Sequence, residues 1–189
     1  RVETRPIKGT RPRGETPAND QALAKELLDS TKDRAENVMI VDLLRNDLGR
    51  VCTPGSIRVP QLCQLESYPN VHHLVSVVQG ELAPAHSPLS LLTAAFPGGS
   101  ITGAPKIRAM EIIAELEPTA RGPYCGSIGW LGFDGWMDTS ITIRTFAIRG
   151  RQVAFQAGGG IVAESEPDDE VDETTTKFKT IFAALGVQP

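Results

Sequence analysis

Apolar side chains recur at helical spacing in five stretches of the chain. Residues 19–35 predict a first helix, and its first two residues, an asparagine and an aspartate, can cap it. Residues 36–48 predict a second helix, which Gly49 is placed to end, although the apolar run 38–44 leaves a buried strand as an alternative. Three further helices are predicted over residues 89–96, 105–117 and 168–185.

Two other regions carry the alternation of apolar and polar side chains that is typical of strands. Residues 56–82 predict two strands, and residues 124–163 predict three antiparallel strands, with an Asp-Gly hairpin signal at 134–135. The first 17 residues are rich in proline and glycine and predict a loop. The expected fold class is therefore α+β, with helices packed on antiparallel sheet.

The composition fits a globular, negatively charged protein. Of 189 residues, 40% are hydrophobic, which is enough for a core, and 19 basic against 23 acidic side chains give a net charge of −4. No global attraction to nucleic acid or to anionic lipid is expected. The three cysteines, Cys52, Cys63 and Cys125, form no C-x-x-C pair, which favours a reducing compartment such as the cytoplasm. No run of about 18 apolar residues predicts a membrane span.

Two groups of carboxylates are candidates for a cation site. Glu170, Glu173 and Lys177 lie on one face of the last predicted helix. In the ordinary interpretation, Glu173 and Lys177 form a favourable i,i+4 ion pair, and acids near the start of the helix interact favourably with its dipole. In the functional interpretation, a carboxylate binds a hard divalent cation and Lys177 binds an anionic group of a substrate. Asp33 and Glu36 form a second pair at helical spacing. Carboxylates from two separate helices would suit Mg²⁺.

Glycine-rich segments and one arginine are candidates for anion binding. The loop 97–104 runs into a predicted helix and offers backbone N–H groups to a carboxylate or phosphate. Gly158, Gly159 and Gly160 lie in a predicted strand, where either close approach of a ligand or a bulge explains them. Arg144 also lies in a predicted strand, so it either points to solvent or clamps an anion.

Two further side chains could take part in catalysis. Lys8 lies between prolines and glycines in the first predicted loop, and it could act as a nucleophile if burial keeps its amine neutral. His73 could act as a general acid or base, although a single histidine on a strand is more often structural. In both cases the ordinary interpretation, a solvated lysine and a structural histidine, stays open.

The order of these motifs along residues 5–186 resembles one family, the chorismate-utilising enzymes. This family includes the anthranilate, isochorismate, salicylate and aminodeoxychorismate synthases, and the resemblance covers nearly the whole chain. Eight motifs carry it: PIKGTRPRG (6–14), KDRAENVMIVDLLRND (32–47), HHLVS (72–76), FPGGSITGAPKIRAMEII (96–113), YCGSIGW (124–130), MDTSITIRT (137–145), AGGGIV (157–162) and DETTTK (172–177).

The resemblance implies a fold, a reaction and partners. The fold is one of layered antiparallel β-sheets with helices packed on them, of which residues 1–189 are the C-terminal part of the chorismate-binding catalytic domain, with the N-terminal portion absent. Anthranilate synthases carry alanine where this chain has Lys8, and the lysine form resembles the aminodeoxychorismate synthases. There the lysine adds to C2 of chorismate with loss of the C4 hydroxyl, and ammonia from a glutamine amidotransferase subunit then gives 4-amino-4-deoxychorismate, for p-aminobenzoate and folate. The alternatives are an anthranilate synthase and, in another class, a non-catalytic fragment that binds chorismate or a partner.

The resemblance also implies roles for the candidate residues. Glu36 and Glu173 are expected to bind Mg²⁺, with Asp33 and Glu170 behind them through water. The remaining residues are expected to contact the substrate: Tyr124 and Arg144 its enolpyruvyl carboxylate, Lys177 with Gly158, Gly159 and Gly160 its ring carboxylate, and His73 with Ser100 the reacting ring.

Overall fold

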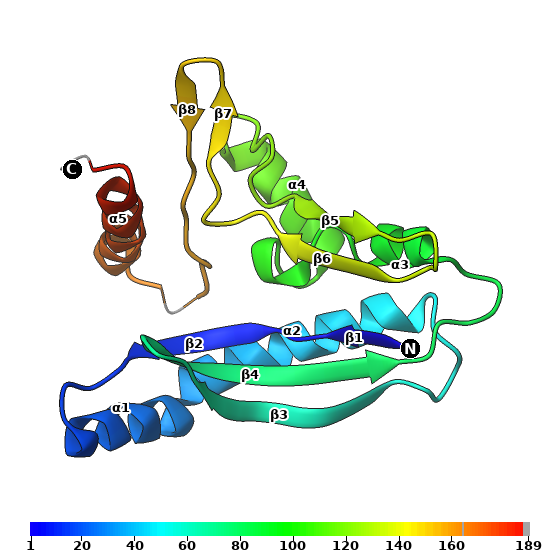
Figure 1. Ribbon diagram of the computed structural model, residues 1–189, viewed down its shortest axis with the longest axis horizontal. Helices are drawn as coiled ribbons and strands as arrows, with labels where there is room; N and C mark the ends of the chain where they lie inside the picture. The colour runs from blue at the N-terminus through cyan, green and yellow to red at the C-terminus, as the bar shows by residue number, and fades with distance from the viewer. Residues whose placement is uncertain (164, 187–189) are drawn as a thin grey trace. The chain divides into compact units, whose positions relative to one another are not determined.

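The computed structural model describes residues 1–163 and 165–186, apart from the side chains of residues 180, 181 and 184. The chain forms two compact units, Arg1–Ile112 and Ile113–Pro189 (Figure 1). Each unit combines antiparallel strands with helices, so the α+β prediction is confirmed.

The sheet of the first unit is organised around one long central strand, β4 (Val71–Gly80). All three of its neighbours run antiparallel to it: β1 (Val2–Thr4), β2 (Ile7–Pro12) and β3 (Arg58–Ser67). The first two pair with different parts of β4, since Val2 lies opposite Gly80 and Ile7 lies opposite Val75. The two strands predicted over residues 56–82 are therefore confirmed.

The prediction of a loop over the first 17 residues was wrong. Most of this segment is β1 and β2, because its backbone completes the hydrogen bonding of β4. The prolines do not prevent this, since Pro6 precedes β2 and Pro12 ends it, where a missing N–H costs little. Gly9 lies within the strand at φ +89°, where the pairing register between β2 and β4 shifts.

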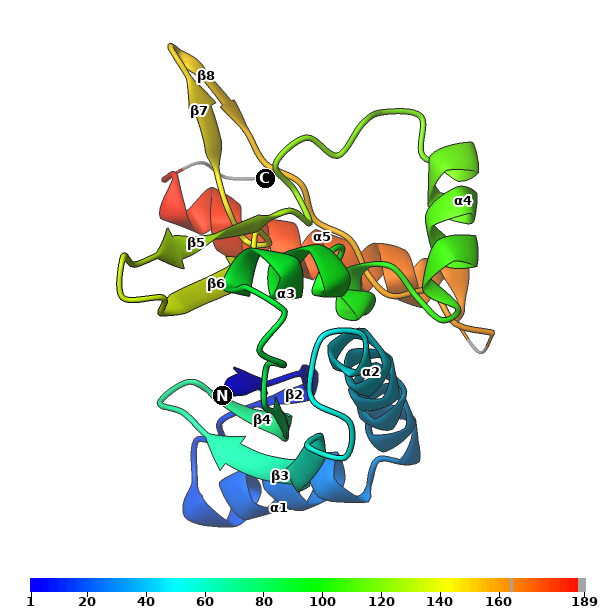
Figure 2. The same cartoon turned by 90° about the vertical axis from the view of Figure 1, so that its right-hand side faces the viewer.

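Two helices pack against this sheet: α1 (Pro17–Asp29) and α2 (Thr31–Gly49) (Figures 1 and 2). The first is capped by Thr16, three residues before the predicted cap, because Pro17 fits the first helical turn. Ser30 caps the second by accepting a hydrogen bond from the backbone N–H of Asp33 at 3.2 Å. The helix therefore continues through residues 38–44, which excludes the strand alternative.

The core of the first unit lies between β4 and these helices. Alternate side chains of β4 point to one face, where Leu74 packs against Leu27 of α1, and Val78 packs against Val41 of α2. All four are at most 3% exposed. Burial of each such side chain stabilises the fold by about 1.5–3 kcal/mol. These contacts hold α2 at a fixed position on the sheet.

A glycine-rich loop completes the first unit. It connects α3 (Pro88–Ala95), which begins with a capping box at Ser87, to α4 (Lys106–Leu116), and it contains one short 3-10 helix, η1 (Gly99–Ile101). The helices predicted over residues 89–96 and 105–117 are therefore confirmed.

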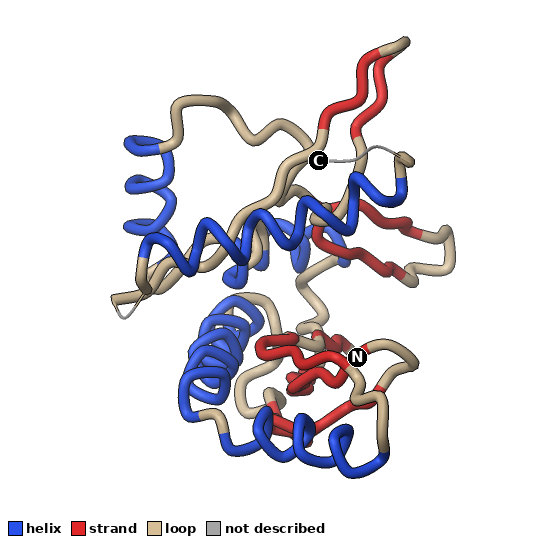
Figure 3. The backbone as a smooth tube through the Cα atoms, turned by 90° about the vertical axis from the view of Figure 1, so that its left-hand side faces the viewer, coloured by secondary structure: helices blue, strands red, loops and turns tan. Residues whose placement is uncertain are grey.

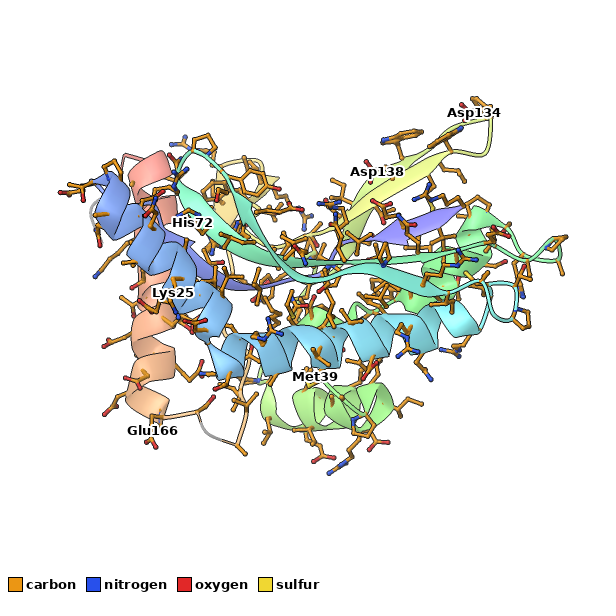
Figure 4. All side chains as sticks on the ribbon, turned by 90° about the horizontal axis from the view of Figure 1, so that it is seen from below. Lys25, Met39, His72, Asp134, Asp138 and Glu166 are labelled. Atoms are coloured by element: carbon orange, nitrogen blue, oxygen red, sulfur yellow. The ribbon has the colours of Figure 1, made fainter. Side chains whose placement is uncertain are left out.

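The described residues of the second unit form two separate hairpins and one further helix after the end of α4. β5 (Ser127–Leu131) pairs with β6 (Met137–Ile141), and β7 (Ala147–Arg149) pairs with β8 (Gln152–Ala154), followed by α5 (Pro167–Ala184). Figure 3 shows β7 and β8 as a narrow ribbon apart from the first hairpin. The Asp-Gly hairpin signal is confirmed, since Asp134 lies in the β5–β6 turn and Asp138 lies on β6 (Figure 4).

The prediction of three long strands over residues 124–163 was wrong in two places. Arg144 has a left-handed backbone (φ +52°), which breaks the run between β6 and β7. Residues 155–160 form no strand, so Gly158, Gly159 and Gly160 lie in irregular backbone rather than in a sheet. The expectation that Arg144 and these glycines lie on strands is corrected accordingly.

Two further findings concern the cysteines and the helices. Cys52, Cys63 and Cys125 are free and buried, as the absence of a disulfide framework requires. Within residues 1–163 and 165–186, no helix is long and apolar enough to span a bilayer.

Candidate active site

Lys8 and Glu36 form the first part of the candidate site. Lys8 lies on β2, not in a loop, and its Nζ lies 3.4 Å from Oε2 of Glu36 on α2. Both side chains are about one-fifth exposed (21% and 22%), so the pair is partly shielded from water. The structure therefore places a primary amine and a carboxylate side by side in the first unit.

Gly9 lets β2 approach α2 at this point. A Cβ at Gly9 would lie 2.9 Å from Cβ of Asp33 and 2.9 Å from Cδ1 of Leu27, and its φ of +89° disfavours any side chain. Arg11, two residues later, donates a hydrogen bond from Nη2 to Oδ2 of Asp33 at 3.3 Å. Two basic side chains of β2, Lys8 and Arg11, thus face two acids that lie one turn apart on α2.

His73 belongs to a different set of contacts. Its Nδ1 is hydrogen-bonded to Oγ1 of Thr10 at 2.9 Å, and its ring meets the ring of Tyr68 edge-on at 5.7 Å. Burial lowers the pKa of His73, against a smaller raising effect from the backbone at Gly9 and from Glu66. Among the described residues, no hydrogen bond or ion pair joins the side chain of His73 to that of Lys8 or Glu36.

The glycine-rich loop brings Ser100 into the first unit. Ser100 is half-buried on η1, and the preceding Gly99 lies directly against Leu43 of α2, where a Cβ would lie 2.9 Å from Cδ1. The loop therefore rests on the same helix that carries Asp33 and Glu36.

The second unit gathers another set of predicted residues around α5. Nζ of Lys177 donates to the carbonyl of Gly158 at 2.8 Å and lies 2.7 Å from Oε1 of Glu173. The i,i+4 pair expected from spacing is therefore present, and the lysine also contacts the glycine run. An anion at this backbone would meet a positive charge that is already in position.

Glu170 has an unusual environment for a carboxylate. Its Oε1 accepts a hydrogen bond from Oγ of Ser165 at 2.6 Å, while its Oε2 is buried and has no hydrogen-bond partner among the described residues. A Cβ at Gly159 would lie only 2.6 Å from this oxygen, which explains why glycine is needed there. A buried oxygen without a donor is costly, and a cation or a donor from a ligand would satisfy it.

Tyr124 lies beside the same glycine run. Its hydroxyl lies 3.2 Å from where a Cβ at Gly158 would be. Burial raises the pKa of Tyr124 to about 12, with a further contribution from Cys125. The phenol therefore stays protonated near neutral pH and can donate a hydrogen bond to a carboxylate. Arg144 is exposed in the loop before β7 and forms no hydrogen bond or ion pair with the residues described.

The four carboxylates of the predicted magnesium site are divided between the units. Asp33 and Glu36 belong to the first, and Glu170 and Glu173 belong to the second. In the part of the chain that the structure describes, no three acidic, histidine or cysteine side chains gather as a metal site. The candidate ligand atoms are nevertheless carboxylate oxygens, which Mg²⁺ prefers. One of them, Oε2 of Glu170, has no hydrogen-bond partner among the described residues.

Sequence reasoning missed several residues that support this site. Thr10 is hydrogen-bonded to His73, Arg11 donates a hydrogen bond to Asp33, and Ser165 donates one to Glu170. Thr10 and Arg11 lie within the PIKGTRPRG motif, so their position beside Lys8 was the available signal. Ser165 lies in no motif, and only the structure identifies its contact.

Comparison with known proteins places these residues in a family. The family model described as chorismate binding enzyme matches residues 1–183. The chain belongs to this family. The match includes every residue assigned to the candidate site, from Lys8 to Lys177.

Individual relatives include more than one activity. Aminodeoxychorismate synthase component 1 of Salmonella typhimurium is 56% identical over 184 residues, covering 97% of this chain and 40% of the relative. Anthranilate synthase component 1 of Aquifex aeolicus is 50% identical over 187 residues, covering 99% of this chain and 38% of the relative. The chain thus spans about two-fifths of the length of these curated relatives.

A solved structure confirms the fold. Anthranilate synthase component I from Streptococcus pneumoniae TIGR4 matches with a TM-score of 0.85 at 42% identity, over 95% of this chain and 39% of that one. The predicted fold class of the chorismate-utilising enzymes is therefore confirmed.

Proposed function

We propose that this chain is the chorismate-converting part of an aminodeoxychorismate synthase component I. Chorismate and ammonia are the substrates, and 4-amino-4-deoxychorismate is the product, which serves p-aminobenzoate and folate synthesis. Lys8 carries the proposal, because a primary amine lies beside a carboxylate at the position where anthranilate synthases have alanine. The 56% identity to a relative with this name supports the same choice.

In the proposed reaction Lys8 is a covalent nucleophile. Its Nζ forms a bond to C2 of chorismate, the double bonds shift, and the C4–O bond breaks with release of water. Ammonia then forms a bond to C4, the double bonds shift back, and the C2–N bond breaks to return the lysine. One ammonia is taken up and one water is released. Nζ must be neutral before it attacks, so the ammonium group that pairs with Glu36 must first lose a proton.

Binding of a dianionic substrate is assigned to the second unit. Lys177 and the backbone of Gly158, Gly159 and Gly160 are proposed for the ring carboxylate, and the contact between Lys177 and Gly158 supports this choice. Tyr124 and Arg144 are proposed for the enolpyruvyl carboxylate, for which the protonated phenol of Tyr124 is a suitable donor. His73 and Ser100 are proposed to lie near the reacting ring.

The proposed cofactor is a magnesium ion. Its ligands are Glu36 and Glu173, with Asp33 and Glu170 behind them through water. Bound there, the ion neutralises one carboxylate of the substrate. The unpaired oxygen of Glu170 supports a cation in the second unit, and the ion pairs of Glu36 and Glu173 with lysines show that both carboxylates already attract positive charge.

Ammonia is assigned to a separate partner. In this proposal a glutamine amidotransferase subunit supplies it, in keeping with the name component 1 of the relatives. The proposed compartment is the cytoplasm, which fits three free, buried cysteines.

The test transfers this chain into a relative of full length. The matching two-fifths of the Salmonella protein is replaced by this chain, and the resulting chimera is incubated with chorismate, Mg²⁺ and ammonium. Intact mass reports any adduct, and chromatography identifies the product. The matched variants are Lys8→Ala and, as a control, Lys25→Ala, which removes an exposed lysine.

Three outcomes are distinguishable. An adduct that Lys8→Ala alone abolishes, together with aminodeoxychorismate, supports the proposal. Anthranilate without an adduct overturns it in favour of an anthranilate synthase, the activity named for the Aquifex relative. A folded protein that binds chorismate without converting it identifies a non-catalytic binding fragment instead.

A further inference from the structure

Asp47 and Lys106 form a largely buried ion pair that the proposed reaction does not use. Nζ of Lys106 lies 2.6 Å from Oδ2 of Asp47, and the two side chains are only 14% and 5% exposed. Each charge interacts unfavourably with the dipole of its own helix. Asp47 lies in the last turn of α2, where the dipole disfavours an acid, and Lys106 begins α4, where it disfavours a base. The pair therefore serves the connection between the helices rather than either helix alone.

The same ammonium closes the glycine-rich loop. Nζ of Lys106 also donates to the carbonyl of Ala95 at 3.2 Å. Ala95 is the last residue of α3 and Lys106 is the first residue of α4, so one side chain joins the two ends of the loop formed by residues 96–105. Through Asp47, both ends are also attached to the C-terminal turn of α2.

Little apolar packing assists this attachment. No residue of α4 is buried. A groove of about 820 Å³ separates the start of α4 from α2, with Met39, Leu43, Ala104 and the ion pair among its lining residues. Figure 4 shows Met39 on the side of α2 away from the sheet. The ion pair thus bridges helices that are held apart along the groove.

We infer that Asp47 and Lys106 are positioning residues that hold the glycine-rich loop on α2, and with it Ser100. The inference rests on the proposed function only in giving Ser100 a place near the substrate. The loop also meets α2 where Gly99 lies against Leu43, so this contact holds its middle and the ion pair holds its ends. Without the pair, we expect the ends of the loop to separate from α2 and Ser100 to be positioned less firmly, because the contact of Gly99 with Leu43 then lacks the support of both loop ends.

The test compares single and double neutralisation of the pair. Lys106→Met and Asp47→Asn each leave one buried charge without its partner, while the double variant leaves none. The matched control is Arg108→Met, which removes an exposed charge from the same helix. Hydrogen exchange of residues 96–105 and thermal melting are measured on the 189-residue chain, and kinetics on the Salmonella chimera described above.

The double variant decides between a positioning role and a purely structural one. We expect it to recover much of the melting temperature lost in the single variants, yet to keep fast exchange in the loop and a kcat/KM for chorismate that is lower by about tenfold to a hundredfold. Loop exchange and kcat/KM equal to those of the unaltered protein would overturn the inference. If the unaltered chimera gives anthranilate or no product, the proposed function fails while hydrogen exchange still tests the attachment.

Discussion

Nζ of Lys8 and Oε2 of Glu36 lie 3.4 Å apart across the junction of β2 and α2. The distance depends on Gly9, since any side chain there would collide with Asp33 and Leu27 and would push the strand away from the helix. The pair is neither fully exposed nor fully buried. Removal of one partner is therefore expected to lower the free energy of unfolding by more than the loss of a surface ion pair does, and by less than the loss of a buried ion pair does.

Lys8→Ala is expected to lower the free energy of unfolding by about 1–2 kcal/mol, because Glu36 is left partly buried without its cation. Lys25→Ala is the control, since it breaks an ion pair with Asp29 whose side chains are 75% and 62% exposed, and it is expected to cost less than about 0.5 kcal/mol. Urea unfolding monitored by circular dichroism measures both. Equal losses would show that the Lys8 pair is as weak as a surface pair.

Gly9→Ala is expected to destabilise the chain by about 2–4 kcal/mol, since it combines a positive φ with a Cβ placed 2.9 Å from two side chains. Gly55→Ala separates the two effects. Gly55 has a similar φ of +76° but no atom within 4 Å of an added Cβ, so only the backbone cost of about 1–2 kcal/mol is expected. The difference in urea midpoint between the variants measures the close approach of β2 to α2. Similar midpoints would contradict this packing.

The existence of the α-helices could be predicted from the sequence, because apolar periodicity occurs with nearby Ser, Thr, Pro or Gly signals. The capping of α3 by Ser87 is an example, since the Ser-Pro pair marks the helix start directly. The predicted boundary between the first two helices was wrong, since the first helix was predicted to run to residue 35 and ends at Asp29, before the cap at Ser30. β1 and β2 could not be predicted in this way. Their stability comes from pairing with β4, about 60 to 80 residues later in the chain, and the prolines in and before β2 suggest a loop to any local analysis.

The candidate site was predictable in its residue types but not in its contacts. The spacing of Glu173 and Lys177 predicts their ion pair, because both lie on one helix. The contact of Lys8 with Glu36 depends on a shift in strand register near Gly9. The position of Arg144 depends on its own left-handed backbone, which interrupts a stretch of strand-forming residues. Local patterns carry no information on such long-range or single-residue features.

Gly159→Ala is expected to displace the carboxylate of Glu170, because the new Cβ would lie 2.6 Å from its buried Oε2. If this oxygen contributes to a cation site, the thermal shift produced by Mg²⁺ should decrease, with an affinity lower by about tenfold or more. Gly158→Ala is the matched variant, since its Cβ would meet only the hydroxyl of Tyr124 at 3.2 Å. An unchanged Mg²⁺ response in Gly159→Ala would remove Glu170 from the proposed magnesium site.

His73 is expected to make stability depend on pH below neutrality. Burial lowers its pKa in the folded chain, so between that value and 6.5 the unfolded chain binds more protons than the folded one. The contribution of this histidine is therefore complete above pH 6.5 and is lost as the pH falls through the lowered pKa. The pKa of Glu66 is also lowered, mainly by its hydrogen bond from Tyr68, but its contribution is lost only below about pH 4.5.

Melting temperatures between pH 5 and 7.5 test this expectation in His73→Gln and in His86→Gln, which alters an exposed histidine. The first variant should flatten the fall in melting temperature towards pH 5, and the second should leave it unchanged. NMR titration of the unaltered chain should give a midpoint for His73 below 6.5. A midpoint at or above 6.5 would mean that Glu66 and the backbone at Gly9 outweigh burial, and the stability would then fall as the pH rises instead.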